Sequence, residues 1–117
     1  MAGLSQAEQQ ATLAARFTSG DHIAYSTNGT SEWAGLERTA IGTWSAPTAA
    51  TPSAVSNTGA LTSAAATAAG TVTSFAIFSA ATGGTQRTDW TAFSESKALG
   101  IGDRATHAVG AIVITLD

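Results

Sequence analysis

The sequence predicts a mainly β domain, an antiparallel β-sandwich or a barrel of jelly-roll type, with a short N-terminal helix. About seven or eight short β-like segments follow residue 21 at intervals of roughly 8–12 residues, separated by turn-forming residues. Ala, Thr, Ser and Gly make up 69 of the 117 residues, and threonine-rich segments of this kind favour sheets. Helical periodicity is clear only before residue 20. We therefore expect a helical arm at residues 1–20 and a β-sandwich domain at residues 21–117.

The expected helix covers residues 5–18 and begins with a capping box. Ser5 and Glu8 are spaced so that each side chain can accept a hydrogen bond from the other residue's backbone N–H. Leu13 and Phe17 lie four residues apart and form a thin apolar face. Gly20 is placed to end the helix in the left-handed conformation. Because so thin a face gives a marginal helix, we expect it to dock on its own domain or on a partner.

In the first half of the β domain, turn and proline signals separate short segments. Asn28-Gly29 is a strong turn pair. Pro47 and Pro52 make residues 45–53 a surface loop, because proline lacks the N–H that a central strand needs. The alanine-rich residues 64–69 are short and precede a glycine, so we expect a loop there. The expected strands in this half are residues 22–27, residues 36–44 and two short pieces within residues 54–63.

The second half contains the clearest strand, at residues 71–79, which carries apolar groups on both faces as a strand between two layers does. The turn Ala-Ala-Thr-Gly-Gly at residues 80–84 follows it, and residues 86–93 are expected to complete a hairpin. The remaining expected elements are short strands at residues 97–101, 104–109 and 111–116, a turn at Gly102-Asp103, and core side chains from Val109, Ile112, Ile114 and Leu116.

The composition argues against several classes of function. The net charge is −3 with five Lys and Arg, so no basic patch is expected and nucleic-acid binding is not predicted. The chain has no Cys, which removes disulfides, thiolate nucleophiles and Cys-bound metals and fits synthesis in a reducing cytoplasm. The first residues do not resemble a signal peptide. The longest apolar stretch is about half a membrane span, so no membrane partner is expected.

No metal site, cofactor or catalytic centre is expected. His22 and His107 lie far apart in the sequence and would need Asp21 or Asp103 to converge with them before they could bind a metal. Surface or interface histidines are the simpler interpretation. The sequence also lacks G-x-S-x-G, H-E-x-x-H and a glycine-rich phosphate loop before a helix. We therefore expect a protein that is not an enzyme.

One acidic pair beside aromatic residues has two interpretations. Asp89 and Glu95 flank Trp90 and Phe93, an arrangement that a glycosidase could use. The same residues could equally lie along an exposed strand edge. We favour the second interpretation, a solvated face.

Five large apolar residues are candidate contacts with a partner or another subunit. Trp33, Trp44 and Trp90 could form a platform for carbohydrate. Alternatively, one or two of them anchor the small core and another lies at a subunit contact, where tryptophan is enriched. We favour the latter, and we add Leu13 and Phe17 of the helix to the candidate contacts.

Three motifs in the last third of the chain resemble a known family. They are GTVTSFAIFSAATGG, SKALGIGD and AVGAIVITLD. The positions that match are Phe75, Ile77, Phe78, Ala80, Ala81, Thr82, Gly83 and Gly84 in the first motif, Ser96, Lys97, Gly102 and Asp103 in the second, and Gly110, Ala111, Ile114, Thr115, Leu116 and Asp117 in the third. The motifs resemble those of small β-domain virion proteins of tailed phages that infect actinobacteria, labelled tail-fibre or minor structural proteins. Residues 36–44 and 56–58 are similar more loosely, and the first 35 residues match poorly.

This resemblance implies a structural component of a virion, without catalytic activity. Only 25 of the 117 residues are large and apolar, so we expect the domain to gain stability from neighbouring copies. The leading hypothesis is a capsid decoration protein, a homotrimer that binds the major capsid protein on the outside of the shell. The alternative is a tail-fibre or tail-tip domain that recognises the host surface through its tryptophans.

Overall fold

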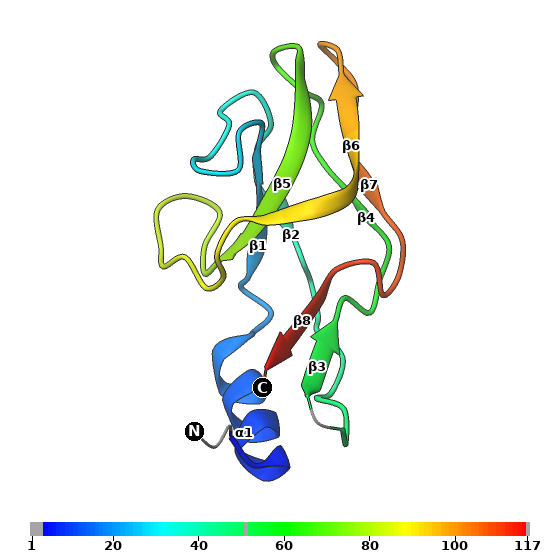
Figure 1. Ribbon diagram of the computed structural model, residues 1–117. Coiled ribbons are helices and arrows are strands. Elements are labelled where there is room, and N and C mark those ends of the chain that lie inside the picture. Colours follow the sequence, from blue (N-terminus) through cyan, green and yellow to red (C-terminus); the bar gives the residue numbers. More distant parts are fainter. Residues whose placement is uncertain (1–3, 51, 117) are drawn as a thin grey trace.

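The computed structural model describes residues 4–50 and 52–116, with one helix and eight strands in that part of the chain (Figure 1). The elements in chain order are α1 (Gln6–Arg16), β1 (His22–Ser26), β2 (Thr39–Ala40), β3 (Ser53–Ser56), β4 (Leu61–Thr62), β5 (Gly70–Phe78), β6 (Thr91–Leu99), β7 (Thr106–His107) and β8 (Val113–Leu116). Within these residues, no helix has the length and apolar character needed to cross a membrane. The predicted mainly β class with a short N-terminal helix is confirmed.

The strands form one larger antiparallel sheet and two small ones. The larger sheet has the order β2-β1-β5-β6, and the smaller ones are the pairs β3-β8 and β4-β7. Figure 1 shows α1 at the end of the molecule occupied by β3 and β8. The start of β5 and the end of β6, where Gly70 pairs with Leu99, lie at the opposite end. The larger sheet ends at β2 and β6 and does not close into a barrel. Of the two predicted architectures, the open sandwich therefore describes the fold better.

Paired residues of β1 and β5 form the centre of the core. Ile23 lies opposite Ile77, and Tyr25 lies opposite Phe75. All four side chains are buried, because β-strand alternation places them on one face of the sheet. They form one core cluster with residues of the same sheet, of β4 and of the connecting segments, namely Leu36, Ile41, Leu61, Ala66, Val72, Leu99, Ala105 and Ile112. The opposite face of β1 and β5 is also buried. This confirms the expectation that the strand predicted at residues 71–79, which is β5, lies between two layers.

The helix begins as predicted and docks on its own domain. The Glu8 N–H donates to the Ser5 hydroxyl oxygen at 3.3 Å. On the buried side, the Ser53 N–H donates to the Gln9 side-chain carbonyl at 2.8 Å, so a polar residue of α1 satisfies the first backbone group of β3. Leu13 is 1% exposed and packs beside it. Of the two docking alternatives, the structure shows the intramolecular one.

The helix ends differently from the prediction. It stops at Arg16, and the Phe17 N–H donates to the Leu13 carbonyl at 3.0 Å while the Phe17 backbone turns extended. Gly20 does not have a positive φ, so the predicted left-handed glycine cap is wrong. The cause is a side-chain contact further along the chain, since the Thr18 N–H donates to the Asp21 carboxylate at 2.9 Å and fixes the exit.

The two strands predicted at residues 86–93 and 97–101 are in fact one strand, β6, which begins at Thr91. Residues 85–90 instead return along the end of β5 without a regular ladder. There the Thr88 hydroxyl accepts from the Ile77 N–H at 3.1 Å, and the Arg87 N–H donates to the Ile77 carbonyl. These contacts replace the regular backbone hydrogen bonds that the predicted hairpin of residues 71–79 and 86–93 would have at this point. Regular pairing resumes with Thr91 opposite Phe75, and a register shift follows before Lys97.

Two further segments are shorter in strand content than the sequence predicts. The expected strand at residues 36–44 is reduced to β2, because Gly42 adopts φ +78° immediately after the buried Ile41. Near the C-terminus, Val109 is 63% exposed and is therefore not a core residue, because it precedes Gly110 in a turn. Ile112 is buried as expected. The expected loop at residues 64–69 is confirmed, while Asp117 and the Leu116 side chain lie outside the described part.

Trp33 packs closely against two glycines. A methyl group built on Gly70 would lie 2.7 Å from the Trp33 ring, and one built on Gly35 would also overlap the same ring atoms. Neither glycine has a positive φ, so close approach alone explains them. The Trp33 backbone N–H donates to the Tyr25 carbonyl at 2.7 Å, and the indole lies against Gly70 at the start of β5. Trp33 thus packs against the core of its own chain.

We expect Gly70→Ala to lower the free energy of unfolding by about 1–3 kcal/mol, because the added methyl group overpacks against the Trp33 ring. Urea denaturation measures the change. Gly59→Ala is the matched control, since a methyl group added there would have no atom within 4 Å and the φ of Gly59 is not positive. Equal effects of the two substitutions would show that the close approach to Trp33 does not constrain position 70.

Candidate functional site

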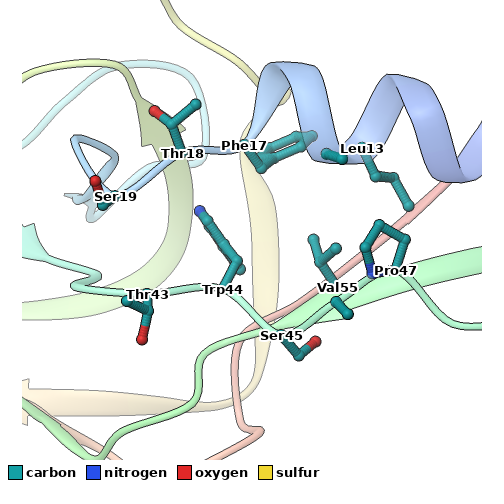
Figure 2. A pocket seen from close by; sticks show the side chains of 11 residues that line it. Leu13, Phe17, Thr18, Ser19, Thr43, Trp44, Ser45, Pro47 and Val55 are labelled. Carbon is teal, nitrogen blue, oxygen red and sulfur yellow. The ribbon is translucent and has the colours of Figure 1, made fainter.

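Three of the five predicted contact residues meet at one hollow. Leu13, Phe17 and Trp44 line a cavity of about 310 Å³ between α1 and residues 43–47, with Pro47 and Val55 completing its apolar wall (Figure 2). The rings of Phe17 and Trp44 meet edge to face, with centroids 5.6 Å apart. Thr18, Ser19, Thr43 and Ser45 also line the hollow, but the hydroxyls of Thr43 and Ser45 are bonded to Thr58 and Ser56. The hollow is therefore mainly an apolar and aromatic surface.

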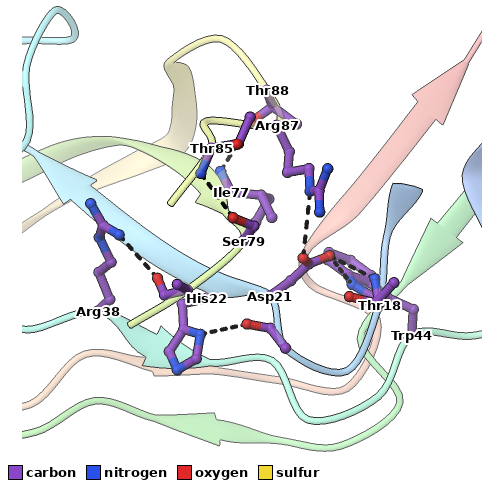
Figure 3. Close-up of polar contacts among 12 residues, drawn as sticks. Thr18, Asp21, His22, Arg38, Trp44, Ile77, Ser79, Thr85, Arg87 and Thr88 are labelled. Atoms are coloured by element: carbon purple, nitrogen blue, oxygen red, sulfur yellow. Dashed lines mark hydrogen bonds and ion pairs between the residues drawn. The ribbon is translucent and has the colours of Figure 1, made fainter. Parts of the chain in front are cut away.

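A buried carboxylate fixes one wall of this hollow. The Trp44 indole N–H donates to Asp21 Oδ2 at 2.9 Å, and the Thr18 N–H donates to the same oxygen (Figure 3). On the other side, Arg87 Nε lies 3.8 Å from Asp21 Oδ1. Asp21 is fully buried. The sequence pointed to Asp21 only as a possible metal ligand; its role in the structure is to orient Trp44 against the helix.

The other two tryptophans lie elsewhere and have their own partners. Trp90 is half-buried against Phe78, with ring centroids 6.1 Å apart, and Trp33 packs on Gly35 and Gly70. The structure therefore does not gather the three tryptophans into one platform. Asp89 and Glu95, the acidic pair near Trp90, are both exposed, in keeping with a solvated face.

The motif residues of β5 and the following turn build the end of this strand and an exposed loop. Phe75 and Ile77 are in the core, and Phe78 lies half-buried at the end of the strand. Gly83 and Gly84 have φ +61° and +72°, values that favour glycine. The predicted turn is therefore confirmed.

Arg38 holds this loop, and no sequence motif indicated that role. Its guanidinium lies 4.0 Å above the Phe78 ring and donates to the carbonyls of Ala80 and Gly83 at 3.0 and 2.8 Å. The same group forms a two-pronged ion pair with Glu32, at 2.9 and 2.8 Å. Arginine suits this place because its planar fork can donate in several directions at once.

The second motif forms the turn between β6 and β7. Gly102 has φ +90°, and the Asp103 carboxylate accepts from the Gly100 N–H at 2.8 Å. This side-chain contact closes the turn that the sequence predicts at Gly102-Asp103. Asp103 thus has a structural partner in its own turn.

His107 is buried, which corrects the expectation of a surface or interface histidine. Its Nε2 lies 3.0 Å from the Tyr25 hydroxyl, which also bonds the Thr39 hydroxyl at 2.7 Å. The imidazole stacks with the Phe93 ring at 5.8 Å. Burial, helped by the nearby positive charge of Lys97, lowers the pKa of His107 to about 4. Burial also raises the pKa of Tyr25 to about 12.

His22, by contrast, is a half-buried residue at the start of β1, with Nδ1 2.8 Å from the Gly20 carbonyl. The two histidines therefore have separate surroundings. Across residues 4–50 and 52–116, no group of three or more acidic or histidine side chains is arranged to hold a metal ion. The described residues thus present an aromatic hollow beside Phe17 and Trp44 and a loop held by Arg38.

We expect Arg38→Lys to loosen the loop at residues 79–85, because lysine keeps the charge but loses the fork to Glu32 and the paired carbonyl contacts. Hydrogen exchange of the loop amides should become faster, with a loss of stability of about 1–3 kcal/mol. Arg104→Lys is the control, since Arg104 donates to a single carbonyl, that of Ser63. Unchanged exchange in the loop of the Arg38 variant would contradict this role.

Stability should fall as the solution is acidified through the range from pH 6.5 to 4. The folded state keeps His107 neutral down to about pH 4, whereas the unfolded chain takes up the proton near pH 6.5. The contribution is therefore complete above pH 6.5 and decreases below it, by about 2–3 kcal/mol across this window. Urea denaturation at a series of pH values measures the slope. His107→Gln should flatten it and His22→Gln should not; an unchanged slope in the first variant would refute the assignment.

A family model of phage fibre proteins matches almost the whole chain. The family is described as Podophage GP4 fiber I protein gp80, and the match spans residues 5–115. It therefore includes α1 and residues 5–35, where the motif resemblance was poor, and says nothing about the group of bacteria infected. No curated protein sequence shows significant similarity to the chain. Because the match covers far more than half of the sequence, the chain belongs to this family of phage fibre proteins.

Proposed function

We propose that this phage structural protein is a module of a tail fibre and contributes to contact with the host surface. The observation that carries the proposal is the family match over residues 5–115, since the family is described as a fibre protein. Capsid decoration, the leading hypothesis from the sequence, has no counterpart in that match and becomes the less favoured alternative. In this proposal the protein acts by binding and has no catalytic role.

The described surface suits a protein that binds through shape and sparse polar groups. The hollow beside Trp44 joins an aromatic floor to the hydroxyl-bearing residues Thr18 and Ser19, and mainly apolar pockets with a few polar groups suit small ligands. Several large apolar side chains also remain exposed, including Ile101 at 76% and Val113 at 48%. We propose that neighbouring chains of the fibre cover some of them, with a homotrimer as the expected assembly.

Cryo-electron microscopy of intact particles tests the location. We expect density for this domain at the tail, in a copy number typical of a fibre, and we expect purified protein to compete with virions for adsorption to host cells. Heat-unfolded protein is the control for the competition. Density distributed over the capsid shell in hundreds of copies, together with no effect on adsorption, would favour decoration and overturn the tail-fibre proposal.

A further inference from the structure

A second hollow lies on the other side of Phe17 and carries two arginines. It has a volume of about 310 Å³ and lies between the last turns of α1 and the segment that follows the β5 turn. Its lining is Thr12, Arg16 and Phe17 from the helical side and Thr85, Gln86 and Arg87 from the segment. This pocket, which we call the arginine pocket, contains two of the five basic residues of a chain whose net charge is −3.

The positive charge of the arginine pocket is only partly neutralised. Within the described residues, Arg16 has no carboxylate within ion-pair distance, since the ion pairs there are those of Arg38 and Arg87. Arg87 Nε lies 3.8 Å from the buried Asp21 Oδ1, and neither atom forms a hydrogen bond within the described chain. The Nε atom of Arg87 is thus paired with the Asp21 carboxylate (Figure 3). Within the described residues, the terminal guanidinium nitrogens of Arg16 and Arg87 donate no hydrogen bond, since the arginine side chains that do so are those of Arg38 and Arg104.

Both walls of the pocket are fixed before any ligand arrives. Thr12 and Arg16 lie one helical turn apart, so they share a face of α1. Opposite them, the Thr85 N–H donates to the Ser79 hydroxyl at 2.8 Å, and the Arg87 N–H donates to the Ile77 carbonyl at 2.6 Å. Such preorganisation lowers the entropic cost of binding.

We propose that the arginine pocket binds a carboxylate-bearing sugar unit of a host-surface polysaccharide, an inference that rests on the proposed role in host contact. Arginine is the preferred partner of a carboxylate because its fork matches the two oxygens. Thr12, Thr85 and Phe17 also line the pocket, and hydroxyl groups and aromatic side chains are groups that suit a sugar ring. A neutral sugar would leave both guanidinium groups without a charged partner. A bare phosphate would use the arginines and leave the aromatic face and the hydroxyls unused.

Amide NMR titration of the full chain tests the ligand class with matched probes. Glucuronate and glucose differ only in the carboxylate at one carbon, and inorganic phosphate supplies charge without a ring. We expect glucuronate to shift the amide signals of residues 12–17 and 85–87, with glucose and phosphate each at least tenfold weaker. Higher salt should weaken glucuronate binding because the interaction is between charges. Glucuronate binding no tighter than glucose would overturn the proposal, as would equal binding of phosphate.

Arg16→Ala is the decisive variant, because Arg16 is exposed and has no ion-pair partner in the described chain. We expect at least a tenfold loss of glucuronate affinity with an unchanged amide spectrum outside the pocket. Arg104→Ala is the matched control, since Arg104 does not line the pocket and bonds the Ser63 carbonyl instead. Equal loss in both variants would show that net charge, and not this pocket, attracts the ligand. Arg87→Ala is a poorer test, because it leaves the Asp21 carboxylate buried beside an empty space.

The outcomes separate this inference from the proposed function. If the domain lies on the tail and blocks adsorption but does not bind glucuronate, the pocket inference fails and the fibre role stands. If glucuronate binds as expected while the domain is found on the capsid shell, the fibre role fails and the pocket stands. Adsorption competition with the Arg16→Ala protein then links the two, since we expect it to compete less well than the Arg104→Ala protein.

Discussion

The placement of the helix end, Trp44 and the segment after the β5 turn depends on one buried carboxylate. A buried carboxyl group needs polar partners, and Asp21 receives them from three separate parts of the chain, Thr18, Trp44 and Arg87. Moving Thr18 or Trp44 would remove a hydrogen bond from the buried carboxyl group, and moving Arg87 would remove its ion-pair partner. The two hollows on either side of Phe17 are therefore coupled to a single buried group, although their outer residues come from elements distant in sequence.

A chain with so few large apolar residues must bring its backbone close together. Alanine on the second face of β1 and β5, where Ala24 lies opposite Ala76, is fully buried, and the Trp33 ring lies directly on glycine. Small residues make such approach possible, so the composition that first suggested dependence on neighbours also produces tight packing within the chain. Polar side chains complete the interior, as Gln9 does by bonding the first residue of β3.

Local signals predicted the parts of the fold that local forces determine. The Ser5 cap, the two-sided strand β5 and the glycine turn at residues 83–84 were each readable from neighbouring residues. The start of β6 was missed because the Thr88 hydroxyl takes the Ile77 N–H that a ladder would use. The burial of His107 was also missed, because its hydrogen-bond partner Tyr25 lies 82 residues earlier in the sequence. Among the predicted contacts, Leu13, Phe17 and Trp44 converge, and no sequence spacing connects Trp44 to the helix.

The sparse charge of this surface makes each basic residue informative. Arg38 is used by the loop after β5, Lys97 donates to the Thr106 carbonyl, and Arg104 donates to the Ser63 carbonyl. Arg16 has no such contact within the described residues, yet it lies at the same hollow as Arg87. On a highly charged protein, two neighbouring arginines such as Arg16 and Arg87 would be one of many similar groups of charges. The chain has only five Lys and Arg and eight Asp and Glu, so two arginines at one hollow are a distinctive feature of its charge distribution.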